Sequence, residues 1–149
     1  MLYDIIIIGG GPAGCAAAVY TARKRLKTLL ITEEFGGQSI VSDDIQNWIG
    51  ELHISGFNLA KKFEEHVAAF PDIVEVKMPE RVVLVRPNGD NFLVTTQSGA
   101  GYESRAVILT PGARRKKLGV PGEEQFNGKG VAYCSTCDAP LFSGRIVGV

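Results

Sequence analysis

The stretch YDIIIIGGGPAG, residues 3–14, decides the fold of this chain. It opens with an apolar run that predicts a buried strand over residues 3–8, and it closes with glycines spaced as G-x-G-x-x-G. Residues 13–23 are rich in helix formers, and residues 28–31 form a second apolar run. A strand, a helix and a parallel strand in this order make a βαβ unit, so the sequence predicts an α/β fold.

The glycines of this stretch match the requirements of a loop that binds the phosphates of a dinucleotide. Gly9 permits the tight turn, Gly11 lets the backbone approach the pyrophosphate, and Gly14 lets the helix pack closely on the strand. An acidic residue about 20 positions later should accept a hydrogen bond from the ribose, and Glu33 and Glu34 lie there. The pattern predicts a site for the ADP half of NAD or FAD, against the alternative of a glycine-rich turn with exposed glutamates.

The next part of the chain predicts a loop, a second helix and an antiparallel meander. Residues 35–55 have no regular period and predict a long loop, which in a compact domain is more often functional than idle. Apolar residues recur at helical spacing over residues 56–70, where Pro71 ends the helix, and the pattern turns to β from residue 73. The meander strands are expected at residues 82–86, 92–96 and 102–109, with an Asn-Gly pair at 88–89 in the first turn.

Composition and charge narrow the classes of function. The 149 residues fit one domain of ordinary size, with 45% hydrophobic and 21% charged residues. The balance of 16 Lys and Arg against 16 Asp and Glu disfavours nucleic acid and anionic membranes as partners. No apolar run approaches the roughly 20 residues that a membrane helix needs. The first strand begins so soon after Met1 that no secretion signal fits before it, so we expect a cytoplasmic protein.

A pair of cysteines near the C-terminal end carries the second chemical signal. Cys134 and Cys137 form a C-x-x-C, which suits thiol–disulfide exchange because one thiolate attacks a partner disulfide and the other resolves the mixed intermediate. A helical turn beginning at Cys134 would lower the pKa of that thiol. Asp138 follows the second sulfur directly and is placed to transfer a proton.

Two alternatives to a redox pair are a structural zinc site and a pair of inert thiols. A zinc site needs four ligands, and the other candidates, Cys15, His53 and His66, are scattered and unpaired, so we expect no metal. Inert thiols stay open, because a single C-x-x-C is a moderate signal. Cys15, just inside the first helix, is expected to be a small packing residue.

Six segments together resemble one family. YDIIIIGGGPAG, EEFGGQ, IQNWIG, VILTPGA, VPGEEQFNGKGV and YCSTCDAPLF are similar, in order and spacing, to the low-molecular-weight thioredoxin reductases and the flavoprotein subunit of alkyl hydroperoxide reductase. The resemblance covers nearly the whole chain. It implies a three-layer ββα sandwich of the FAD/NAD(P)-binding type, in which a parallel Rossmann-like sheet is joined by a three-stranded meander.

The same resemblance implies the domain organisation and the cofactors. Residues 1–114 would be the first segment of an FAD-binding domain, and residues 115–149 the crossover and the start of a domain that binds NADPH. Residues 145–149 would begin the first strand of that second domain. The chain contains one glycine-rich dinucleotide loop, so by itself it is not expected to turn over NADPH.

The family's cofactor residues can be carried over onto matching positions. The glycine loop would hold the pyrophosphate, residues 32–38 would line the adenosine ribose and the ribityl chain, and Asn47 would approach the flavin. The family's A-T-G at the end of the third meander strand is here Thr110-Pro111-Gly112, so the threonine hydroxyl expected to serve the flavin is displaced or lost. The residues expected to bind FAD are Gly9, Gly11, Pro12, Ala13, Gly14, Thr32, Glu33, Glu34, Gly36, Gly37, Gln38, Asn47, Thr110 and Gly112.

The resemblance also implies a reaction. Cys137 would be the sulfur that meets the flavin, Cys134 the sulfur that attacks the protein substrate, and Asp138 the acid. Hydride would pass from NADPH through FAD to the Cys134–Cys137 disulfide, and the dithiol would reduce a thioredoxin-like or peroxiredoxin-linked protein. A homodimer is expected for the full-length form. The alternatives are a non-catalytic module that binds FAD or another nucleotide, and a redox sensor.

Overall fold

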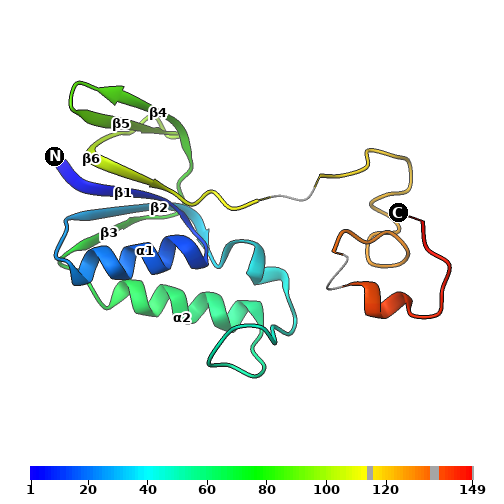
Figure 1. Cartoon of the computed structure of the whole chain (residues 1–149). Helices are drawn as coiled ribbons and strands as arrows, with labels where there is room; N and C mark the ends of the chain where they lie inside the picture. The colour runs from blue at the N-terminus through cyan, green and yellow to red at the C-terminus, as the bar shows by residue number, and fades with distance from the viewer. Residues whose placement is uncertain (114–115, 135–137, 149) are drawn as a thin grey trace. The chain divides into compact units, whose positions relative to one another are not determined.

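The computed structural model describes residues 1–113, 116–134 and 138–148. The chain divides into two compact units, residues 1–113 and 114–149. The first unit holds the β-sheet and both α-helices (Figure 1). Its elements in chain order are β1 (Leu2–Gly10), α1 (Pro12–Arg23), β2 (Thr28–Phe35), the 3-10 turn η1 (Gly37–Val41), α2 (Gly56–Ala68), β3 (Val74–Lys77), β4 (Val82–Asn88), β5 (Asn91–Thr96) and β6 (Gly101–Leu109).

The observed elements follow the predicted order, with longer first and second strands. Both β1 and β2 continue past their apolar runs because Gly10 pairs with Phe35 beyond a register shift that follows Ile8. The predicted loop over residues 35–55 contains the turn η1 near its start. The helix α2 ends at Ala68, shortly before the predicted end at residue 70.

The strands form one six-stranded sheet in the order β3-β2-β1-β6-β5-β4. The strands β3, β2, β1 and β6 run parallel, whereas β6, β5 and β4 make the antiparallel meander. The strand β6 belongs to both parts, because Glu103 pairs with Leu2 of β1 and with Leu93 of β5. The predicted α/β fold is confirmed, and the meander is hydrogen-bonded to the parallel strands through β6.

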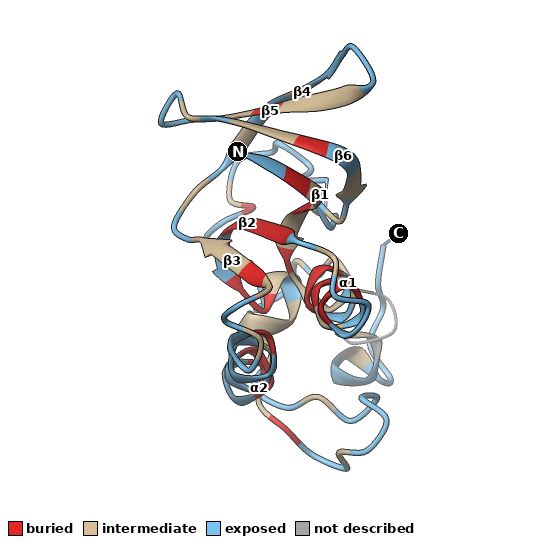
Figure 2. Cartoon of the chain, turned by 90° about the vertical axis from the view of Figure 1, so that its left-hand side faces the viewer, coloured by how far each residue is buried: buried red, intermediate tan, exposed pale blue. Residues whose placement is uncertain are grey.

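Two hydrophobic cores lie on opposite faces of the parallel strands. Successive side chains of a strand point to opposite faces, so the fully buried Ile6 and Ile7 enter different cores. Ile7 packs with Leu30 and with α1 and α2, whereas Ile6 packs with Val94 of the meander. Each such side chain stabilises the fold by roughly 1.5–3 kcal/mol. Figure 1 shows both helices on the same side of β1–β3, and Figure 2 shows buried segments on the strands β1, β2 and β3 and on both helices.

The second unit contains little regular structure. Its described element is the 3-10 turn η2 (Ala139–Phe142). The strand predicted for residues 145–149 is not formed: residues 145–148 have no regular secondary structure, and Val149 lies outside the described residues. A strand needs a neighbour for its backbone hydrogen bonds, and the described residues offer this segment no such pairing. Within the described ranges, no helix is long and apolar enough to cross a membrane.

Candidate functional site

The turn from β1 into α1 is held by close backbone contacts. Gly9 has a φ of 111°, a conformation that favours glycine, and a Cβ there would lie 2.2 Å from the Thr110 carbonyl oxygen. A Cβ on Gly14 would lie 1.8 Å from the Gly9 carbonyl oxygen. The first and third glycines of the motif are therefore required by the packing of the turn itself.

The second glycine lies at the start of the helix, where a Cβ could be accommodated without a close contact. A Cβ on Gly11 would have the Cα of Gly37, at 3.9 Å, as its nearest neighbour. Gly11 is the N-cap of α1 and has no side-chain cap, and Pro12 occupies the first turn. In the described part of the chain, the first amide of this helix that donates to a backbone carbonyl is that of Cys15, which donates to the Gly11 carbonyl oxygen at 3.0 Å. The free amides and the positive end of the helix dipole make this turn suited to an anion.

The end of β2 supports the turn through a threonine side chain. The Thr32 hydroxyl accepts a hydrogen bond from the Gly10 amide at 2.9 Å and donates one to the Glu34 carbonyl oxygen at 2.7 Å. Thr32 is buried, whereas the side chains of Glu33 and Glu34 are exposed. The Thr32 hydroxyl, predicted to line the ribose, is thus already used within the protein.

Gly10 was not among the residues predicted for the site, although it is part of its frame. A Cβ on Gly10 would lie 2.6 Å from the Thr32 hydroxyl oxygen. The signal in the sequence was the uninterrupted run of three glycines, of which the motif uses only two.

The loop after β2 brings two more predicted residues beside the glycine turn. The Gly36 amide donates to the Gly10 carbonyl oxygen at 2.9 Å, and a Cβ on Gly37 would lie 3.3 Å from the Cα of Gly11. Both glycines have positive φ, 96° and 54°. Gln38 follows in η1 with its side chain exposed. The structure thus brings Gly11 and Gly37 together from two separate sequence motifs.

The end of β6 reaches the same turn from the other neighbouring strand. The Thr110 hydroxyl donates to the carbonyl oxygens of Ile8, at 2.8 Å, and Gly9, at 3.2 Å. Gly112 is exposed, and among the described residues other than its chain neighbours no heavy atom lies within 4 Å of where its Cβ would be. The Thr110 side chain is therefore bonded to the backbone of the glycine turn, whereas Gly112 is exposed to solvent.

Asn47 lies on an excursion of the chain between η1 and α2, and its side chain is exposed. The excursion is closed at its base by an antiparallel pair between Ile45 and Ile54, and Trp48 packs edge-on against Phe63 of α2 with ring centroids 5.2 Å apart. The excursion is therefore anchored to α2 rather than free.

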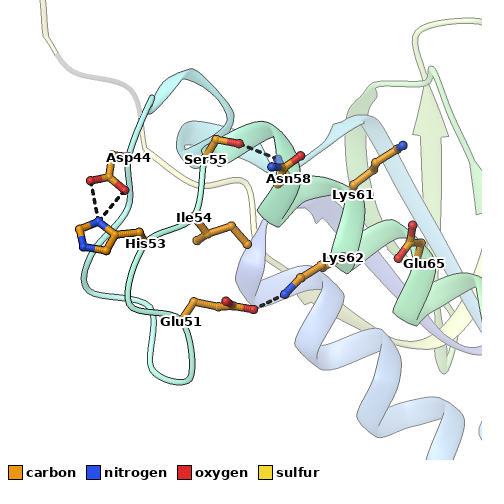
Figure 3. Close-up of a pocket in the computed structure, with 9 residues that line it drawn as sticks. All are labelled: Asp44, Glu51, His53, Ile54, Ser55, Asn58, Lys61, Lys62 and Glu65. Carbon is orange, nitrogen blue, oxygen red and sulfur yellow. Dashed lines mark hydrogen bonds and ion pairs between the residues drawn. The ribbon is translucent and has the colours of Figure 1, made fainter.

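A cleft of about 540 Å³ lies between this excursion and α2 (Figure 3). Its polar side chains largely pair with one another: His53 with Asp44 at 3.0 Å, and Lys62 with Glu51. The pKa of Asp44 is lowered, first by the hydrogen bond from Gln46 and then by that from His53. None of the residues predicted to bind FAD lines this cleft, whose lining residues are Asp44, Glu51, His53, Ile54, Ser55, Asn58, Lys61, Lys62 and Glu65.

Cys15 is a packing residue. Its side chain is buried, and the thiol donates to the Gly10 carbonyl oxygen at 3.3 Å. Burial raises the pKa of this thiol to about 12, so it is not a thiolate near neutral pH. Cys15 is thereby separated from the redox chemistry predicted for the other two cysteines.

The cysteine pair lies in the second unit, and only part of it is described. The Cys134 amide donates to the Asp138 carboxylate at 3.0 Å, and the Asp138 amide donates to the Cys134 carbonyl oxygen at 2.8 Å. Residues 135–137 lie outside the described residues, so Cys137 and its predicted disulfide stay predictions. The two hydrogen bonds bring the predicted acid, Asp138, next to the backbone of Cys134.

A buried carboxylate that sequence reasoning missed organises the same unit. Glu123 is 5% exposed and accepts hydrogen bonds from the amides of Leu118, at 2.8 Å, and Gly119, at 2.6 Å. It also accepts one from the hydroxyl of Tyr133, the residue before Cys134. This bond lowers the pKa of Glu123 and raises the pKa of Tyr133 to about 12. The only signal in the sequence was the acidic pair after Pro121-Gly122.

Within the described ranges, no group of three or more His, Cys, Asp or Glu side chains could hold a metal ion.

Comparison with known proteins places these features in a family. A family model described as pyridine nucleotide-disulphide oxidoreductase matches residues 3–144. A protein named NADH dehydrogenase from Bacillus subtilis is 42% identical over 99% of this chain and 28% of its own length. A subunit of alkyl hydroperoxide reductase from Pseudomonas aeruginosa is 40% identical, with the same coverage of 99% and 28%.

A solved structure shows the same relationship. Thioredoxin reductase from Streptococcus pyogenes superposes with a TM-score of 0.80 and 42% identity, over 95% of this chain and 45% of that one. The chain thus spans less than half the length of these proteins. The close glycine turn, the six-stranded sheet and the extent of the matched residues lead to one conclusion: this chain belongs to the pyridine nucleotide-disulphide oxidoreductase family.

Proposed function

We propose that this chain is the FAD-binding portion of an NAD(P)H-dependent disulfide reductase and carries its redox-active cysteine pair. The observation that carries the proposal is the close approach of Gly11 and Gly37 at the N-terminus of α1, which has no side-chain cap. Names of similar proteins support it, since they include a thioredoxin reductase and a subunit of alkyl hydroperoxide reductase.

The residues present fit the pyrophosphate of FAD. Gly11 and Gly37 bring their backbones together with no side chain on either residue, and a Cβ on Gly37 would lie 3.3 Å from the Cα of Gly11. Ala13 and Gly14 lie in the first turn of α1, which favours negative charge. The exposed carboxylates of Glu33 and Glu34 at the end of β2 are available to the adenosine ribose. Bound FAD would supply a two-electron carrier between a pyridine nucleotide and a disulfide.

The cysteine pair would do the exchange chemistry. In the reduced protein, the Cys134 thiolate attacks a disulfide of the partner protein, forms a mixed disulfide and releases one partner thiolate. Cys137 then attacks the Cys134 sulfur, which re-forms the intramolecular disulfide and releases the second partner thiolate. Asp138, hydrogen-bonded to the Cys134 amide, is the group proposed to move the accompanying proton.

The partner and the nucleotide follow from the same chemistry. We propose a thioredoxin-like or peroxiredoxin-linked protein as the disulfide substrate, and a homodimer as the full-length form. NADPH is the nucleotide proposed from the resemblance to thioredoxin reductases. The name of the Bacillus relative, NADH dehydrogenase, favours NADH as the second candidate. We also propose residues 1–114 as the FAD-binding segment and residues 115–149 as the beginning of the nucleotide domain.

A trapping experiment tests the exchange step. Cys137→Ser should leave Cys134 to form a stable mixed disulfide with oxidised thioredoxin, seen as a covalent adduct by mass spectrometry under non-reducing conditions. Cys134→Ser is the matched variant, and it should form far less adduct. An adduct of equal yield from both variants, or from neither, would contradict the proposed roles.

A further inference from the structure

Thr110 lies where β6 meets the glycine turn, and its hydroxyl is committed to the backbone of β1. It donates to the carbonyl oxygens of Ile8, at 2.8 Å, and Gly9, at 3.2 Å, while the Thr110 amide donates to the Ile8 carbonyl oxygen at 2.9 Å. The hydroxyl and the amide of Thr110 therefore both bind the end of β1, just before α1. These bonds join residues about a hundred positions apart in sequence.

The same hydroxyl also fills the space beside the first turn of α1. A Cβ on Gly14 would lie 2.8 Å from the Thr110 hydroxyl oxygen, and one on Gly9 would lie 3.1 Å from it. The Gly9 carbonyl oxygen in turn lies close beside Gly14. Thr110, Gly9 and Gly14 thus form one junction, in which the Gly9 peptide lies against both the Thr110 hydroxyl and the first turn of α1.

We propose that Thr110 is a positioning residue for the dinucleotide phosphates. Its hydroxyl fixes the Gly9 peptide and so holds the first-turn amides of α1 in the orientation that binds an anion. It also donates to the Gly9 carbonyl oxygen, which reduces the negative charge that this oxygen would present beside the anion. This inference rests on the proposed function for its ligand, FAD, and assigns Thr110 to the phosphates rather than to the flavin ring.

Two substitutions separate the hydroxyl from the shape of the side chain. Thr110→Val keeps the branched shape and removes the hydroxyl, whereas Thr110→Ser keeps the hydroxyl. The full chain is titrated with FAD and, separately, with ADP, which has the phosphates and no flavin. We expect Thr110→Val to weaken both ligands by the same factor, roughly five-fold, and Thr110→Ser to bind as the unsubstituted chain does. A loss confined to FAD would overturn the proposal, because it would place Thr110 at the flavin.

A second readout needs no ligand. Amide hydrogen exchange of Gly10, Cys15 and Thr110, whose amides are hydrogen-bonded at this junction, should be about ten-fold faster in the free chain of Thr110→Val than of Thr110→Ser, while exchange in β5 stays the same. Equal exchange in the two variants would overturn the positioning role. If the unsubstituted chain binds neither ADP nor FAD, the proposed function fails, and the exchange measurement still decides whether Thr110 holds the turn.

Discussion

The hydroxyl of Tyr133 donates a hydrogen bond to the buried carboxylate of Glu123, which also accepts hydrogen bonds from the amides of Leu118 and Gly119. One carboxylate therefore joins the loop after the sheet to the residue that precedes Cys134. This unit has little regular secondary structure, so a single buried hydrogen-bonded group carries much of its order.

Replacing that carboxylate should loosen the second unit selectively. Glu123→Gln removes the charge that attracts three donors, so we expect cleavage by a protease within residues 116–133 to become about five-fold faster. Glu124→Gln is the matched control, because Glu124 is exposed and its side chain makes a surface ion pair with Lys117 at 2.8 Å. Mass spectrometry of timed digests measures both rates. Equal rates for the two variants would contradict the role of Glu123.

The Glu123–Tyr133 pair also predicts a pH dependence. The pKa of Tyr133 is raised from 10.0 to about 12, so its contribution to stability is fully present below pH 10 and is lost as the pH rises through 12. The pKa of Glu123 is lowered from 4.5, so its contribution is present above that pH and is lost as the pH falls below it. Tyrosinate absorbance is followed against pH in the unsubstituted chain and in Tyr133→Phe. The difference between the two curves reports Tyr133 and should show a transition near pH 12. A transition near pH 10 would count against the hydrogen bond.

Cys15 should behave as an inert thiol in the folded protein. In the double variant Cys134→Ser, Cys137→Ser it is the sole thiol, and its raised pKa and burial predict negligible reaction with a thiol reagent at pH 8. The same variant should react fully in denaturant. Rapid labelling under native conditions would show that Cys15 is accessible.

The prediction for the third glycine is structural. Gly14→Ala places a methyl group 1.8 Å from the Gly9 carbonyl oxygen, so we expect the free energy of unfolding to fall by about 3 kcal/mol in urea. Gly101→Ala is a suitable control, because the nearest atom to its Cβ is a flexible leucine methyl at 3.6 Å. A Gly14→Ala chain as stable as Gly101→Ala would refute the close packing.

Local patterns predicted the fold well where the structure depends on local contacts. The apolar run before Gly9 and the helix formers after it predicted β1 and α1, and the Asn-Gly pair predicted the β4–β5 hairpin. The shared role of β6 was not predicted, because its pairing with β1 joins residues far apart in the chain. The short strand β3 alternates polar and apolar residues and was located only as the beginning of a β pattern.

The candidate site shows the same division. The glycine spacing identified Gly9, Gly11 and Gly14, although backbone geometry requires a glycine only at the first and third of these positions. The hydroxyl bonds of Thr32 and Thr110 depend on which distant strand end lies beside the turn, so the sequence could indicate these residues but not what their side chains contact. The strand predicted at residues 145–149 was wrong over 145–148, since an apolar segment forms a strand only where a partner strand accepts its hydrogen bonds.

FAD binding by the glycine turn is the central claim, and an equilibrium titration of the full chain tests it most directly. Gly11 has an ordinary φ of −74°, and the Cβ of an alanine there would have the Cα of Gly37, at 3.9 Å, as its nearest neighbour from another part of the chain. Gly11→Ala should therefore retain the fold, while its methyl group occupies the position proposed for the phosphates. We predict saturable binding of FAD that is weakened at least about ten-fold in Gly11→Ala and unchanged in Gly101→Ala. Equal binding by the Gly11→Ala and unsubstituted chains, or no saturable binding by the unsubstituted chain, would contradict the claim.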